Sequence, residues 1–247
     1  MSTGHRRGEA KGGTELHQVL GEADTAHLLQ IKRTVDPSHD IAYGGGISVD
    51  GRTIYIDRQL RDEVMSGRIY VRGMTPSQIL AAWLKRHEPS EWAIEFGDNP
   101  SDTYQSSHGF ATALEEEFVR TLGVNPERYE ECIKPGLKAC IKRFIKLGRD
   151  ANPPKDLWCG PYLDAPDSDD EEILRVMRAK GVKDAFKKSK ANVQYSMGEN
   201  ECRDCAMFGD KDIHPGLRYC DLVSGLVRKN RWCCLWTARK GKSNGNG

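Results

Sequence analysis

The clustering of cysteines near the C-terminus is the feature that most constrains this chain. Five of the eight cysteines lie close together there, and Cys202 and Cys205 form a C-x2-C pair. Such a pair places two thiolates on one tight turn, where both can bind the same metal centre. Cys220 and Cys233 follow as isolated cysteines that can supply two further ligands. A segment this small has too little core to fold without a staple, so we predict a metal-stapled module over residues 190–240.

The spacing of these cysteines also suits a structural zinc site with four thiolate ligands. Such zinc sites usually carry two C-x2-C pairs, and the second half of this segment has none, so zinc is the alternative at the same cysteines. Cys234 is left as a spare thiol that we expect to pack or to be exposed. Cys132 and Cys140 fall on a predicted helix, where free cysteines are commonly buried as small apolar side chains.

The residues around the four cysteines narrow the choice of metal. They are Val193-Gln194-Tyr195 before the pair, Phe208 after it, Val223-Ser224-Gly225-Leu226-Val227 after Cys220, then Arg231-Trp232-Cys233 and Trp236. Over about residues 190–238, this order resembles the high-potential iron–sulfur protein family. The resemblance implies one [4Fe–4S] cluster that cycles between its 3+ and 2+ states. Its ligands would be the thiolates of Cys202, Cys205, Cys220 and Cys233.

Aromatic side chains around such a cluster have a physical role, because the exclusion of water and the hydrogen bonds to sulfur set its potential. We expect four aromatic residues to shield the cluster, namely Tyr195, Phe208, Trp232 and Trp236. Arg231 stands where the family has a glycine. A cation there stabilises the reduced, more negative cluster and should raise the potential.

The overall composition excludes some classes of partner. The formal net charge is +1, from 37 basic and 36 acidic side chains, which gives no electrostatic reason to expect nucleic acid. No apolar run approaches the roughly 18–20 residues that a spanning helix needs, so no membrane is expected. The N-terminal sequence lacks the apolar region of a secretion signal, which predicts a cytoplasmic protein with reduced thiols.

The rest of the chain predicts an α+β fold. Residues 1–40 are expected to be largely disordered or extended, with a possible helix over 15–33, and 241–247 a disordered tail. An α+β domain over 41–150 would then contain a β-hairpin, three helices and a short extra strand, and 151–189 would be a Pro-rich linker with one helix. The predicted hairpin joins strands over 47–49 and 53–56 around Asp50-Gly51, and the extra strand covers 68–71. Helices are predicted to begin at Thr75 and to cover 104–122, 126–147 and 171–180.

A second group of ligand types lies in the predicted helices. His87-Glu88-Pro89-Ser90-Glu91 places a histidine and a carboxylate four residues apart on one helical face, where they can share a Zn or Fe ion. His108 and Glu115 are candidates for further ligands. This loosely resembles minimal zinc-peptidase-like domains, in which Glu88 would be the general base.

Two features argue against a working peptidase at this second group. The usual second histidine of the motif is missing, and Pro89 would clash with the carbonyl of Lys85 and kink or restart the helix. We therefore expect a structural or relict metal here, and no peptidase activity. If the two helices pack face to face, the site should lie near the end of the hairpin, close to Tyr55 and Asp57.

One-electron transfer or redox sensing by the cysteine module is the favoured function. It requires a protein redox partner or a larger protein assembly, and it favours an electron-transfer or structural metalloprotein over an enzyme. The first alternative is a structural protein of a larger assembly, with a metal that only stabilises the fold. The second is a metallohydrolase that uses His87, Glu88 and Glu91. The sequence does not indicate the oligomeric state.

Overall fold

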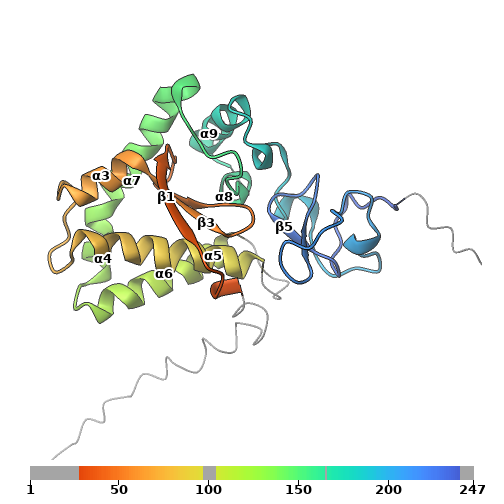
Figure 1. Ribbon diagram of the computed structural model, residues 1–247, viewed down its shortest axis with the longest axis horizontal. Helices are drawn as coiled ribbons and strands as arrows, with labels where there is room; N and C mark the ends of the chain where they lie inside the picture. Colours follow the sequence, from red (N-terminus) through yellow and green to blue (C-terminus); the bar gives the residue numbers. More distant parts are fainter. Residues whose placement is uncertain (1–27, 97–103, 165, 240–247) are drawn as a thin grey trace, which may run out of the picture.

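The computed structural model describes residues 28–96, 104–164 and 166–239, which form the predicted α+β fold (Figure 1). The helix expected over 15–33 and the tail over 241–247 fall largely outside these residues. A small sheet and a group of helices make up the first two thirds of the described chain, and short elements joined by loops make up the rest. No helix among the described residues is long and apolar enough to cross a membrane.

The sheet has three strands in the order β1-β3-β2, with bounds Thr34–His39 for β1, Gly45–Ile47 for β2 and Thr53–Asp57 for β3. β2 and β3 are antiparallel, with Ile47 opposite Ile54, so the predicted hairpin is confirmed. Gly51 takes a φ of 72° at its turn, a conformation that glycine adopts without strain. β1 pairs parallel to β3, and it lies in a segment for which no strand was predicted.

One continuous helical rod follows the sheet. It consists of α4 (Pro76–Ala81), the π-helical turn η1 (Ala82–His87) and α5 (Glu88–Glu95). Thr75 caps it as predicted: its side chain accepts a hydrogen bond from the Gln78 N–H, while the Gln78 side chain accepts one from the Thr75 N–H. The rod packs against α6 (Tyr104–Thr121), and α7 (Pro126–Leu147) follows with Asn125 as its N-cap. The boundaries of both later helices agree with the prediction.

The strand predicted over 68–71 is wrong. α3 (Arg58–Met65) leads into a loop in which Gly67 and Gly73 have φ values of 75° and 95° and reverse the chain toward α4. Ile69 and Val71 are buried in the helical core, so their apolar character serves packing against helices rather than pairing in a sheet.

The segment expected to be a linker contributes to the core instead. Leu157, Trp158 and Cys159 are buried, and the Trp158 N–H donates to the Ile47 carbonyl at 2.9 Å, so this segment covers the free edge of β2. Its prolines suit a segment that crosses the protein without regular structure. The short helix η2 (Gly148–Asp150) precedes this segment. Three helices come after it, namely α8 (Gly160–Leu163), α9 (Ser168–Ala179) and η3 (Lys183–Phe186). α9 is the helix predicted over 171–180, and its N-cap is Asp167.

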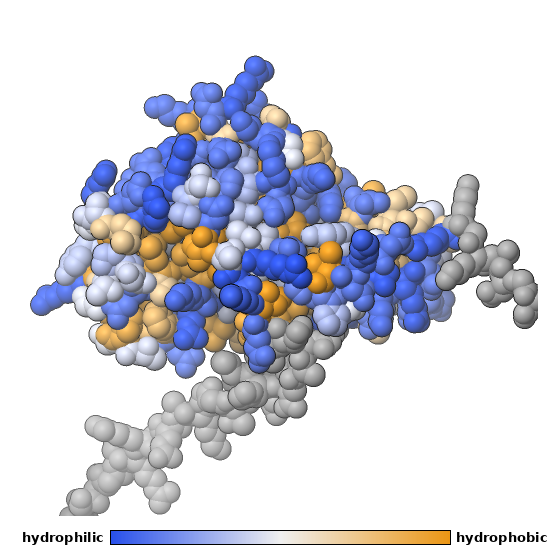
Figure 2. All heavy atoms as spheres, in the orientation of Figure 1, coloured by the Kyte–Doolittle hydropathy of each residue, from blue (hydrophilic) through white to orange (hydrophobic). Residues whose placement is uncertain are grey.

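The C-terminal region contains η4 (Ala191–Val193), η5 (Cys202–Asp204) and a hairpin of β4 (Leu217–Tyr219) with β5 (Leu226–Arg228). It lies at one end of the molecule in Figure 1. Leu217 and Leu226 belong to the same hydrophobic cluster as Trp92 and Phe96 of the α5 region, so this region shares a core with the first part of the chain. Figure 2 shows apolar side chains over the helical part of one face and a mostly hydrophilic surface over the C-terminal region.

Candidate metal centres

The four cysteines predicted as ligands come together in the C-terminal region. Cys202, Cys205, Cys220 and Cys233 are each only 5–7% exposed and belong to one hydrophobic cluster. Cys234 is exposed, which is one of the two arrangements expected for a spare thiol. None of the eight cysteines forms a disulfide. Four buried thiols that face one another are therefore available to a metal centre.

Backbone hydrogen bonds hold the loops that carry these thiols. The Cys205 N–H donates to the Cys202 carbonyl at 2.9 Å, which closes the tight turn expected of a C-x2-C pair. The Cys202 N–H donates to the Arg231 carbonyl at 2.6 Å and so ties the pair to the segment before Cys233. An isolated bridge joins Phe208 to Cys220. Each ligand-bearing loop is thus fixed by another.

Simultaneous deprotonation of the four buried thiols is electrostatically unfavourable unless a cation binds among them. Burial, together with the neighbouring thiols of Cys233, Cys220 and Cys205, raises the pKa of Cys202 to about 12. Burial likewise raises the pKa of Cys220 and of Cys233. Iron or zinc would supply the positive charge that offsets this repulsion, because a metal-bound thiol is deprotonated.

Three of the four aromatic residues predicted around the cysteines pack in their cluster. Phe208 is buried there, and Tyr195 and Trp236 pack against it. The Tyr195 hydroxyl accepts a hydrogen bond from the Arg228 N–H at 2.6 Å, and Trp236 Nε1 donates to the Glu201 carbonyl at 2.9 Å. Trp232 differs: it is half-buried and lies over Gly198, where an added Cβ would approach the Trp232 Cβ to 2.9 Å.

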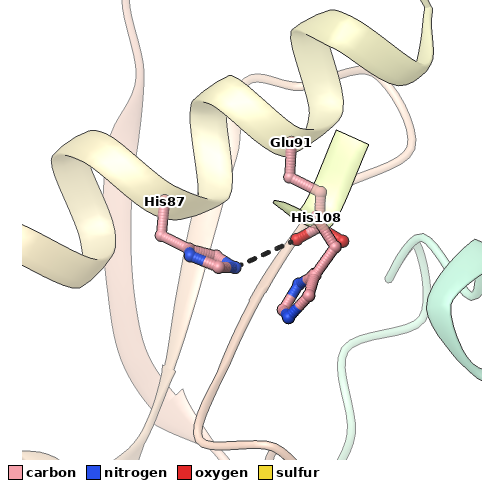
Figure 3. Close-up of side chains that lie close together, drawn as sticks. All are labelled: His87, Glu91 and His108. Atoms are coloured by element: carbon pink, nitrogen blue, oxygen red, sulfur yellow. Dashed lines mark ion pairs between the residues drawn. The ribbon is translucent and has the colours of Figure 1, made fainter. Parts of the chain in front are cut away.

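The second predicted group also assembles, at the junction of the helical rod with α6. His87 ends η1, Glu91 is on α5, and His108 and Glu115 are on α6. His87 Nε2 is 3.5 Å from Glu91 Oε2, and His87 Nδ1 is 2.9 Å from Glu115 Oε2. His108 Nδ1 is 3.8 Å from Glu91 Oε1. Figure 3 shows the side chains of His87, Glu91 and His108 converging on one point.

This group opens into a cavity of about 460 Å³. Glu88 lines the cavity beside the four residues, and so do Gly45 of β2 and Trp83 of η1. The site borders the hairpin, because Gly45 lines the cavity and pairs with Ile56, which lies between Tyr55 and Asp57 in β3. The Tyr55 hydroxyl donates to Asp156 and Asp57 caps α3, so both side chains are engaged elsewhere.

Gly45 and Trp83 line the candidate site, and the sequence did not single them out. A Cβ at Gly45 would lie 2.3 Å from Glu88 Oε1, so only glycine leaves room for that carboxylate. Trp83 Nε1 donates to the same oxygen at 3.0 Å. The run of three glycines at 44–46 was the available signal, because such a run permits close approach to a backbone.

The pKa values at this group follow from burial and from close charges. Burial lowers the pKa of His87, but contacts with Glu115 and Glu91 outweigh it and raise that pKa to about 10. Burial raises the pKa of Glu88 to about 8. Burial also opposes ionisation of Glu91, but His108 and His87 lower the pKa of this carboxyl. The group therefore holds charged side chains away from water.

Comparison with protein-family models, with curated proteins and with solved structures gave no match to this chain. The resemblance of residues 190–238 to the high-potential iron–sulfur proteins accordingly rests on the residues that carry it. Function must be argued from the geometry of the two groups.

Proposed function

We propose that this protein binds one [4Fe–4S] cluster through Cys202, Cys205, Cys220 and Cys233, and that it acts in one-electron transfer or redox sensing. The observation that carries the proposal is the joint burial of these four thiols in one cluster with aromatic side chains. An apolar, water-poor surrounding suits an iron–sulfur cluster, because solvent exclusion sets its potential.

The surroundings of the cysteines favour a redox role over a purely structural one. Phe208, Val223 and Val227 are buried around the thiols, and a water-poor site raises the potential of a cluster. Cys233 lies between half-buried Trp232 and exposed Cys234, so one edge of the cluster would be near the surface. A docked protein partner, alone or within a larger assembly, could exchange an electron there.

We also propose a cytoplasmic location. Eight cysteines without a disulfide suit a compartment that keeps thiols reduced.

Voltammetry on the brown, anaerobically purified protein distinguishes a redox role from a structural one. We expect a reversible one-electron couple well above the roughly −400 mV of plant-type ferredoxins, because the cluster is dry and Arg231 is buried close to it. A couple near −400 mV would contradict the high-potential assignment. The absence of any couple would favour the structural alternative.

A further inference from the structure

A buried carboxylate oxygen that accepts no hydrogen bond points to a second metal centre in the helical region. Glu91 is 5% exposed, yet its Oε1 has no hydrogen-bond partner among the described residues. A buried acceptor that lacks a hydrogen bond destabilises the fold, and more so when it is charged. Burial of this oxygen therefore calls for a ligand.

The neighbours of this oxygen are metal-ligand types. One atom from each of His87, Glu91 and His108 lies within 4.8 Å of the other two. Two imidazoles with one carboxylate suit Zn²⁺ and Fe²⁺ rather than Mg²⁺ or Ca²⁺, which prefer all-oxygen sites. His87 and Glu91 are 10% and 6% exposed at their side chains, so two of the three ligands are shielded from bulk water.

Glu115 contacts the imidazole nitrogen of His87 that faces away from Glu91. It contacts Nδ1 of the imidazole at 2.9 Å, while the opposite nitrogen, Nε2, faces Glu91. The Tyr129 hydroxyl donates to Glu115 Oε1 at 2.5 Å and fixes this carboxylate. A carboxylate on the far nitrogen of a metal-binding histidine sets its tautomer and the direction of its ring.

The π-helical turn accommodates Pro89, which was expected to clash with the carbonyl of Lys85 and to disturb this group. The Glu88 N–H donates to the Trp83 carbonyl, five residues back, so the helix is widened immediately before the proline. Pro89 then occupies the first turn of α5, where its missing N–H costs nothing. His87 and Glu91 remain on one face of the rod, as the ligand set requires. Single π-turns of this kind are frequent at functional sites.

We propose that His87, Glu91 and His108 bind one divalent transition-metal ion such as Zn²⁺, that Glu115 positions His87 without binding the ion, and that the fourth coordination position is open to water. Three protein ligands with one open position distinguish catalytic zinc sites from structural ones. The cavity of about 460 Å³ gives a second molecule access to that position. Glu88 lines the same cavity as a non-ligand carboxylate that can accept a proton from metal-bound water.

The test is a titration of Co²⁺ into the full-length protein after treatment with a chelator. We expect one equivalent to bind at the His87 group, with visible bands that lack the sulfur-to-cobalt charge transfer of thiolate ligation. Any further equivalent at cysteines that the chelator has emptied should show that charge transfer and should not change in the variants of the His87 group. His87→Ala, His108→Ala and the nearly isosteric Glu91→Gln should each weaken binding about 100-fold or more. Glu115→Gln should weaken it about 10- to 100-fold and leave the cobalt spectrum unchanged. Glu117→Gln, at an exposed position of α6, is the matched control, and it should bind as the wild type does.

Three outcomes would overturn parts of the proposal. Equal affinity for Co²⁺ in the wild type and in folded Glu91→Gln would refute the proposed site. A changed cobalt spectrum in Glu115→Gln would make Glu115 a ligand. Acetohydroxamate should alter the cobalt spectrum by occupying the open position, and the absence of any change would show that the position is closed. Repeating the titration in Cys205→Ser keeps the test independent of the iron–sulfur proposal.

Discussion

Asp184 accepts a hydrogen bond from the Gly225 N–H at 3.1 Å and thereby joins η3 to the loop before β5. The same carboxylate accepts hydrogen bonds from the Cys159 N–H, at 2.9 Å, and from the Ser224 hydroxyl. Asp184 is 1% exposed. One buried carboxylate thus connects the core segment around Cys159 to the region that carries the four clustered cysteines.

Replacement of Asp184 by alanine should destabilise the protein by about 3 kcal/mol. Three donors would lose their acceptor, and each unsatisfied buried donor costs about 1–3 kcal/mol, offset in part by water entry. The free energy of unfolding from urea titration is the measurement. Exposed Asp150→Ala is the control and should change it by less than about 0.5 kcal/mol. Equal effects of the two variants would refute the role given to Asp184.

Asp57 should be equally important in the first part of the chain. Its carboxylate caps α3 by accepting from the Gln59 and Leu60 N–H groups, and it pairs with Arg143 of α7. Asp57→Ala should cost about 2–4 kcal/mol, because it removes the cap and leaves a guanidinium without its partner. Asp62→Ala on the same helix removes only an exposed pair with Arg61 and should be nearly neutral. Thermal unfolding of both variants decides the matter.

The ligand assignment predicts which cysteines can be replaced. Serine at position 202, 205, 220 or 233 should abolish cluster binding, because each ligand holds one iron. Cys234→Ser should keep the full iron content, since that thiol is exposed. Iron per chain, measured on the five variants, tests this. Full iron in Cys233→Ser together with loss in Cys234→Ser would reverse the assignment of these two neighbours.

Thiol reactivity should show the same division. In the cluster-loaded protein, iodoacetamide at mildly alkaline pH should modify Cys234 rapidly. Cys140 should not react, because it is buried and burial raises its pKa to about 12. Removal of iron with a chelator should expose the four ligand cysteines to the reagent. Peptide mass spectrometry locates the modified residues, and modification of Cys202 or Cys220 while iron is still bound would contradict the account.

Local signals predicted much of the fold, because their physical causes are local. Asp50-Gly51 fixes the hairpin turn, and Thr75 with Gln78 fixes the start of the helical rod. The strand expected over 68–71 failed because β-propensity cannot reveal that Ile69 and Val71 pack against helices. The linker expected at 151–170 failed because prolines outweighed the apolar Leu157-Trp158-Cys159 sequence.

The candidate sites were predictable to a similar extent. Spacing of four residues placed His87 and Glu91 on one face, and the cysteine pattern predicted which thiols would assemble. The role of Glu115 was not predictable, because it depends on which imidazole nitrogen each carboxylate faces. Nor was the π-turn immediately before Pro89, where the rod packs against α6.

The central claim is a [4Fe–4S] cluster on four cysteines, and analysis of inorganic sulfide tests it most directly. Anaerobically purified full-length protein should contain about four acid-labile sulfides per chain, with at least as many irons, and should be brown. Iron or zinc at the His87 group adds no sulfide, so that site cannot mimic this result. A colourless protein without sulfide, whose zinc is lost in Cys205→Ser, would contradict the claim.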